Sequence, residues 1–161
     1  MSPRLELLKQ TFGMRLFGWL KIPLLASVRP SVVELSESRC VVRVPLRRFT
    51  RNHLGSMYFG ALAIGADCAG GLLAMDQIKR SGNRVSLVFK SFQATFLKRP
   101  ESDVYFICDE GEAIRDQVLR AMNSAERITE PMHMTAAIRL PDGTYEPVAE
   151  FMLELSLKRR S

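Results

Sequence analysis

The stretch from Asn52 to Ile78, NHLGSMYFGALAIGADCAGGLLAMDQI, constrains the fold of this chain more than any other segment. Between Met57 and Met75 it carries a single charged residue, Asp67, among alanine, glycine, leucine and isoleucine. An apolar run of this length is too long for a buried strand and predicts a helix. We expect Ser56 to cap the N-terminus of this helix and Gly82 to stop it.

Small residues collect on the Asp67 side of the predicted helix. Because side chains repeat every 3.6 residues, the carboxylate shares its face with Gly60, Ala63, Gly70, Gly71 and Ala74. Each glycine inside a helix costs about 1 kcal/mol relative to alanine, so another group should approach this face closely. Two interpretations stay open: tight packing of a strand or second helix, which we favour, and a thin ligand that passes a reactive carboxylate.

The composition is that of an ordinary globular chain with a basic surface. Its 161 residues fit one domain, and 47% of them are hydrophobic. The net charge of +6 suits an anionic partner. The positive charge is scattered, however, apart from Arg47, Arg48 and Arg51 and the tail 158–160, so a basic solvated surface is the simpler interpretation. No strand interleaves aromatic and basic residues, so nucleic-acid binding is not expected.

The cysteines and the N-terminus favour a reducing compartment. Cys40, Cys68 and Cys108 have neither the spacing of a zinc site nor that of a disulfide framework, so we expect free buried thiols and no metal site. The first ten residues lack the pattern of a signal peptide, and Asp67 argues against a membrane span for the long helix. We therefore predict a cytoplasmic protein.

Residues 4–25 have the apolar and basic spacing of an amphipathic helix that Pro23 should end. One stripe can contain Leu5, Leu8, Phe12, Leu16 and Trp19. A basic amphipathic helix of this kind either packs on its own domain as a cap or anchors on a membrane surface. We expect residues 1–29 to form such a cap, and hence no membrane contact.

The other segments read as strands. The turn chemistry and period-two patterns predict a hairpin over Val32–Leu46, a short helix or long loop over Glu112–Ser124, and strands at Arg84–Leu97, Val104–Asp109, Ile128–Leu140 and Val148–Leu157. Hairpin connections imply an antiparallel sheet. A helix that is apolar on all sides must be wrapped, and a curved sheet of about six strands is the available wrapper. The predicted fold is α+β, in one domain over residues 1–161.

This order of elements resembles the hotdog fold, and specifically the PaaI-like acyl-CoA thioesterases, over residues 30–158. In that family the long helix opens with an asparagine, followed six residues later by His-Gly-Gly and then by an acid nine residues after the histidine. Asn52, Gly60 and Asp67 match this pattern, whereas Tyr58 and Phe59 replace the histidine and the first glycine. The chain is even closer to relatives that keep N…G…GAL without the histidine.

The resemblance implies hydrolysis of a thioester. The backbone N–H groups near Phe59 or Gly60 would polarise the thioester carbonyl, and Asp67 would act as general base or nucleophile. Ser86, which matches a serine on the strand after the helix, would hold the attacking water. Asn52 would position the carbonyl or the water.

Two further roles follow from the same resemblance. Tyr58 can donate a hydrogen bond where the family has histidine. The phosphates of coenzyme A, which is part of the substrate and not a cofactor, would bind basic residues at the mouth, for which the candidates are Lys90, Lys98 and Arg99.

The spacing along the helix bears on how many chains form one site. Tyr58 and Asp67 are nine residues apart, about 13.5 Å along the axis at 1.5 Å per residue, so one reaction centre cannot use both from one chain. The resemblance implies a homodimer in which Arg84–Leu97 pairs with its twin, so that each helix start faces Asp67 of the other chain. Whether dimers pair into tetramers stays open.

Alternatives remain for the function and for single residues. A hotdog protein that binds acyl-CoA without turnover would explain the missing His-Gly, and a hydratase or dehydratase would have to use His53. We interpret His53 and His133 as ordinary polar contacts. Asn52 has a second interpretation as a turn residue, and Asp67 as the partner of an arginine or a buried N–H.

Overall fold

The computed structural model describes residues 3–82 and 84–160. In chain order the elements are α1 (Pro3–Lys21), α2 (Pro23–Ser27), β1 (Ser31–Leu35), β2 (Cys40–Val44), α3 (Phe59–Arg80), β3 (Val85–Phe96), β4 (Val104–Cys108), α4 (Gly111–Met122), β5 (Ile128–Arg139) and β6 (Tyr145–Arg159). The predicted order of elements is confirmed, and the segment that the sequence left as a helix or a loop is the helix α4.

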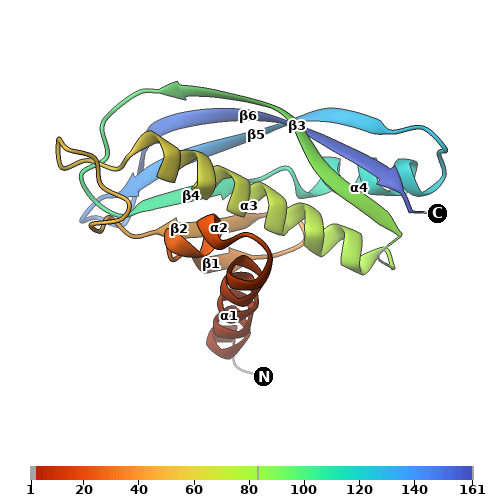
Figure 1. Ribbon diagram of the computed structural model, residues 1–161, viewed down its shortest axis with the longest axis horizontal. Helices are drawn as coiled ribbons and strands as arrows, with labels where there is room; N and C mark the ends of the chain where they lie inside the picture. Colours follow the sequence, from red (N-terminus) through yellow and green to blue (C-terminus); the bar gives the residue numbers. More distant parts are fainter. Residues whose placement is uncertain (1–2, 83, 161) are drawn as a thin grey trace.

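The six strands form one antiparallel sheet in the order β1-β2-β4-β5-β6-β3. Figure 1 shows α3 lying along the concave side of this sheet, with β3 running back beside it. The predicted α+β fold, with a long helix wrapped by about six strands, is confirmed. Two strands, β1 and β3, lie at the edges of the sheet.

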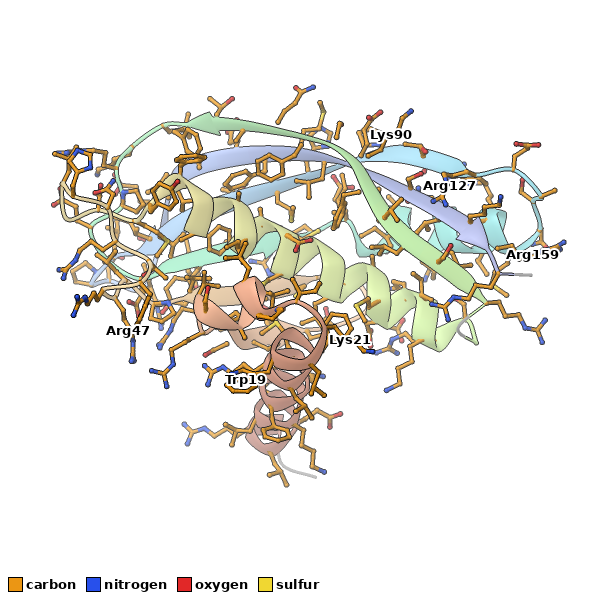
Figure 2. The ribbon with its side chains drawn as sticks, viewed as in Figure 1. Trp19, Lys21, Arg47, Lys90, Arg127 and Arg159 are labelled. Atoms are coloured by element: carbon orange, nitrogen blue, oxygen red, sulfur yellow. The ribbon has the colours of Figure 1, made fainter. Side chains whose placement is uncertain are left out.

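A bulge in β3 keeps its aromatic side chains on the helix side. Phe89 pairs with Leu155 and Phe92 with Leu153, so β3 advances three residues while β6 advances two. Because Leu153 and Leu155 are both buried, their cross-strand partners also face α3. Lys90 lies in the bulge, and Figure 2 shows it on the outer side of the sheet, away from α3.

The structure contradicts the predicted N-cap of α3 and confirms the residue predicted to stop it. The N-cap residue is Tyr58, whose side chain makes no capping hydrogen bond, so the predicted cap at Ser56 is wrong. Ser56 is buried instead in the preceding loop, where Asn52 binds it. At the other end, Ser81 is the C-cap residue, and Gly82 follows with a φ of 89°. Glycine adopts that left-handed conformation without strain, so Gly82 is confirmed as the stop.

Close packing of the sheet explains two of the four glycines in α3. A Cβ atom on Gly65 would overlap the buried ring of Phe106, and one on Gly70 would overlap the side chain of Met132. The favoured interpretation of tight packing is therefore confirmed at these positions. Gly70 lies under the sheet rather than in a groove with Asp67, and Ala74 is also buried. Of this small-residue face, Gly71 stays beside the carboxylate, with room for a methyl group.

The burial of α3 helps to decide whether this long apolar helix is a core helix or a membrane span. Within residues 3–82 and 84–160, this helix is the one long and apolar enough to cross a membrane by composition, and 50% of its apolar window is buried inside the structure. It is the core helix of the sheet.

The N-terminal helix α1 packs on its own domain, but not through its apolar stripe. Thr11 Oγ1 accepts the N–H of Val32 at 2.9 Å, and Arg15 Nε donates to the carbonyl of Pro30 at 2.7 Å. Figure 1 shows α1 projecting from the body of the molecule. The stripe that suggested amphipathic packing is solvent-exposed at all five positions: Leu5, Leu8, Phe12, Leu16 and Trp19.

Replacing Gly65 by alanine should lower the free energy of unfolding by about 1–3 kcal/mol, because the new methyl group would press on the immobile ring of Phe106. Gly71→Ala is the matched control in the same helix. It should raise the free energy of unfolding by up to about 1 kcal/mol through helix propensity. Urea denaturation followed by circular dichroism measures both, and an equal loss in the two variants would contradict the packing explanation.

Candidate functional site

A cavity of about 410 Å³ opens at the N-terminal end of α3. Its walls come from the loop before α3, the first turns of the helix, the end of β3 and the segment that follows β3. The residues predicted for the site that line it are Asn52, Tyr58, Phe59, Lys98 and Arg99. The structure therefore brings together residues from two segments that lie about 40 positions apart in the sequence.

Hydrogen bonds fix the start of α3 against the cavity. The carbonyl of Thr50 accepts the N–H of Tyr58 at 2.8 Å, and the carbonyl of Pro100 accepts the N–H of Met57 at 2.9 Å. The buried Thr50 hydroxyl in turn donates to the carbonyl of Pro45 at 2.7 Å. These bonds tie the loop before α3 to the segment after β3, so the position of the helix start is fixed by both.

The first two N–H groups of α3 have no acceptor among the residues that the structure describes. The carbonyl of Tyr58 accepts the N–H groups of Ala61 and Leu62, which begins the helical pattern. Within the described part of the chain, no acceptor serves the N–H groups of Phe59 and Gly60. The first turn of a helix always leaves such donors, and its dipole favours negative charge beside them. This end of α3 can therefore bind a carbonyl or anionic oxygen.

The Asn52 side chain closes its own loop. Its Oδ1 atom accepts the N–H groups of Leu54 at 2.9 Å and Ser56 at 3.2 Å, and its Nδ2 atom donates to the Ser56 hydroxyl at 3.1 Å. Gly55 completes the turn with a φ of 87°. The interpretation of Asn52 as a turn residue therefore describes what it does in this protomer, and one Nδ2 hydrogen remains for another acceptor.

Asp67 lies in the third turn of α3, outside the lining of the cavity. It is half-buried, and its carboxylate makes no hydrogen bond or ion pair with residues 3–82 and 84–160. The predicted alternative of an arginine or buried N–H partner is therefore not found. Removal from water raises the pKa of the Asp67 carboxyl group. Along the helix axis it is about 12 Å from Phe59 at 1.5 Å per residue, too far for both to act on one atom.

Ser86 and Lys90 lie away from the cavity in this protomer. Ser86 stands at the beginning of β3, where its hydroxyl donates to the carbonyl of Lys158 at 3.1 Å. Because β3 runs back along α3, this position is near the C-terminal end of the helix, opposite to the cavity. Lys90 projects from the outer side of the sheet (Figure 2). One chain alone does not place either side chain beside Phe59 or Gly60.

Exposed cations form the rim of the cavity. Lys98 Nζ pairs with Glu146 Oε1 at 2.8 Å, and Arg99 Nη2 lies 3.7 Å from Glu101 Oε1. Exposed pairs contribute about 0–1 kcal/mol, so an anionic ligand can compete with either acid.

Sequence reasoning named His53 only for the hydratase alternative, and it gave no site role by name to two further cavity residues, Leu62 and Phe96. His53 follows Asn52 directly, which is the one signal that could have placed it at the helix start. The other two belonged to apolar patterns that predicted core packing. Phe96 is instead 52% exposed, because it stands at the end of an edge strand beside the helix start.

A family model describes most of this chain. The model of a domain of unknown function, DUF4442, matches residues 13–154. The chain belongs to the DUF4442 family.

Solved structures show the fold of this DUF4442 protein. A protein of unknown function from Pseudomonas aeruginosa, described as a probable thioesterase, is 22% identical with a TM-score of 0.76, over 93% of this chain and 96% of that one. A thioesterase family protein from Silicibacter pomeroyi is 16% identical with a TM-score of 0.67, over 93% and 99%. A protein of unknown function from Chlorobaculum tepidum is 10% identical with a TM-score of 0.78, over 93% and 94%. No curated protein matches the sequence. The likeness confirms the hotdog fold.

Asp67→Asn should make the DUF4442 protein more resistant to urea at pH 8. The folded state holds the Asp67 proton more tightly than the unfolded state does, because burial raises its pKa. The penalty for a charged, desolvated carboxylate is therefore complete above the folded pKa and absent below the unfolded pKa. The stability gain of the variant should shrink as the pH falls through this window. A constant difference between pH 8 and pH 4 would contradict the desolvated carboxylate.

Proposed function

We propose that this DUF4442 protein hydrolyses acyl-CoA-type thioesters at a site shared by two protomers. The observation that carries the proposal is the apolar cavity at the start of α3, where the N–H groups of Phe59 and Gly60 have no acceptor within the described residues. The likeness in fold to proteins described as thioesterases supports the reaction class.

The chemistry follows from these groups. The carboxylate of Asp67 takes a proton from water, and the hydroxide oxygen attacks the carbonyl carbon of the thioester. The carbonyl oxygen becomes negative, and the N–H groups of Phe59 and Gly60 stabilise it. The carbon–sulfur bond then breaks, and the thiolate leaves with the proton, so that the products are a carboxylic acid and a thiol. In the other form of this proposal Asp67 attacks directly and water then cleaves the acyl-enzyme.

The walls of the cavity suit the two parts of the substrate. Leu62, Phe96 and Leu97 offer apolar surface to an acyl chain, while Lys98 and Arg99 at the rim offer donors to phosphate groups. In this proposal Asn52 positions the thioester carbonyl or the attacking water by donating its remaining Nδ2 hydrogen. Ser86 and Lys90 keep the proposed roles of holding water and binding phosphate only if the partner protomer brings them to this cavity.

The separation of Asp67 from the helix start requires a second protomer. The edge strand β3 is a suitable surface for it, because the sheet leaves one side of β3 unpaired in the single chain. Its apolar residues Val88, Phe92 and Phe96 are exposed, which is unusual for a strand that stays at an edge. Pairing of β3 with its twin would give a two-fold dimer with two equal sites.

A non-catalytic acyl-CoA-binding protein is the second candidate. Two observations favour it. Tyr58 and Phe59 replace the His-Gly pair of the resembling thioesterases, and all three hydrogen bonds of the Asn52 side chain described above are made to Leu54 or Ser56 within its own loop. Such a protein would bind the thioester without releasing thiol.

The three cysteines of this DUF4442 protein are free and buried, which supports our proposal that it works in a reducing compartment such as the cytoplasm.

Phe59→Pro should lower kcat for thiol release about 100-fold or more, because it removes one N–H donor from the oxyanion. Proline suits this position: it is the first residue of the helix, and Tyr58 before it is extended, with a ψ of 139°. Phe59→Ala is the matched control, since it removes the ring and keeps the N–H group. A thiol–disulfide exchange assay, which detects the coenzyme A thiol released from a panel of acyl-CoAs, measures both variants. Similar losses in the two variants would show that the N–H group has no part in the reaction.

Two inactive variants should restore each other if the site spans two protomers. Asp67→Asn and Phe59→Pro each damage both sites of a homodimer, whereas a mixed dimer keeps one intact site. After subunit exchange of equal amounts, half of the dimers are mixed, so activity should return to about a quarter of the wild-type value. Each variant alone at the same total concentration is the control. Activity that survives in Asp67→Asn alone removes the proposed base, and binding of acyl-CoA by wild-type protein without thiol release favours the second candidate.

A further inference from the structure

The N-terminal helix α1 is turned with a partly polar side toward its own domain. Thr11 and Arg15 on this side bind β1 and the segment before it, and Arg15 Nη2 also donates to the Ser31 hydroxyl at 2.7 Å. Met14 is the one large apolar residue of α1 that is buried among the described residues. This is the reverse of an ordinary surface helix, in which the apolar side packs on the core.

The opposite side of α1 is mostly apolar, and we call its exposed apolar residues the outer face. It consists of six residues that are 46% to 77% exposed: Leu5, Leu8, Phe12, Leu16, Trp19 and Leu20. At 3.6 residues per turn these positions fall within about 120° of the helix circumference. A soluble monomer rarely leaves such a patch open, so the outer face indicates a contact with another surface.

Contacts of α1 with α2 and with the backbone around β1 fix the orientation of the outer face. Gly18 of α1 lies against α2, where a Cβ atom would stand 3.0 Å from Leu25 Cδ2 and 3.1 Å from the Ala26 nitrogen. This close approach, together with the bonds of Thr11 and Arg15, holds α1 in one position. Figure 1 shows the helix projecting beyond the sheet, and the residues of the outer face are all exposed.

Positive charge predominates on α1. The helix itself contains Arg4, Lys9, Arg15 and Lys21 against one acid, Glu6.

A second group of cations lies next to Arg15. Desolvation and then the nearby charges of Arg29, Arg43 and Arg47 lower the pKa of Arg15. Arg29 and Arg47 are exposed and have no ion-pair partner within residues 3–82 and 84–160. Figure 2 shows Arg47 and Trp19 on the same side of the molecule. Arg29 and Arg47 are thus cations near the outer face that have no ion-pair partner in the described part of the chain.

We propose that the outer face of α1 docks on an anionic lipid surface. Apolar side chains enter the boundary of the headgroups, and the adjacent arginine and lysine side chains meet lipid phosphates, which is the pattern of an interfacial helix. A second copy of this chain is less suited, because two such faces in contact would bring their cations together. The inference goes beyond the proposed hydrolysis and does not depend on it.

Trp19 gives the experiment a native reporter, because it is the only tryptophan in the sequence. The full-length protein is mixed with vesicles of phosphatidylglycerol or of phosphatidylcholine, and both tryptophan emission and co-sedimentation are recorded. With phosphatidylglycerol we expect a shift of the emission to shorter wavelength, together with sedimentation that falls as salt is raised. With phosphatidylcholine we expect neither.

Variants separate the outer face from other exposed apolar residues. The double variant Phe12→Glu/Leu16→Glu should weaken vesicle binding more than about tenfold, since it removes two apolar contacts and adds two negative charges. Leu119→Glu is the control, because Leu119 is 47% exposed on α4 and has no place in the proposed surface. Thermal unfolding of each variant confirms that it is folded.

Every other outcome overturns the proposal. Absence of binding to phosphatidylglycerol removes the membrane, and equal binding to both lipids removes the role of the cations. Loss of binding in Leu119→Glu equal to that in the double variant shows that the contact is not made by α1. A blue-shifted emission that depends on protein concentration without vesicles assigns the outer face to a second copy of the chain.

Discussion

The close approach of α3 to the sheet is the constraint on which the rest of the structure depends. It is possible because Gly65 and Gly70 have no side chain at the points where Phe106 and Met132 lie against the helix. Those aromatic and sulfur-containing side chains fill the core between helix and sheet. With the buried side of α3 fixed in this way, the rotation of the helix is also fixed, and Asp67 is left half-buried.

The same packing separates the chemical groups of the candidate site. A straight helix that lies along the sheet puts its unused N–H groups at one end and Asp67 in its third turn. Burial without a partner makes the carboxyl group of Asp67 a stronger base than an exposed aspartate. The edge strand β3 runs beside both positions, so the surface that would receive another protomer also borders the cavity. Our proposal of a second chain thus rests on the geometry of one helix.

The N-terminal helix shows a second consequence of local packing. Because Arg15 and Thr11 bind the backbone around β1, a partly polar side of α1 is turned inward and most of its large apolar side chains point outward. A hydrophobic stripe in a sequence is usually taken as the side that packs on the core. Here the hydrogen-bonding capacity of the strand edge decides the orientation, and the stripe becomes a surface.

Local patterns in the sequence determined the elements, their order and the wrapped helix, because hydrophobic period, turn residues and the stop at Gly82 act over a few residues. Asp67 was identifiable as the one charge in an apolar run, and Lys98 and Arg99 as cations after a strand. Only the tertiary structure decided the rest. It placed Asn52, His53 and Phe96 at one cavity, moved the helix start from Ser56 to Tyr58, and left Ser86 and Lys90 at a distance. These outcomes depend on contacts between segments far apart in the chain, such as the bond from Met57 to Pro100 and the bulge opposite Leu153 and Leu155, which no local pattern encodes.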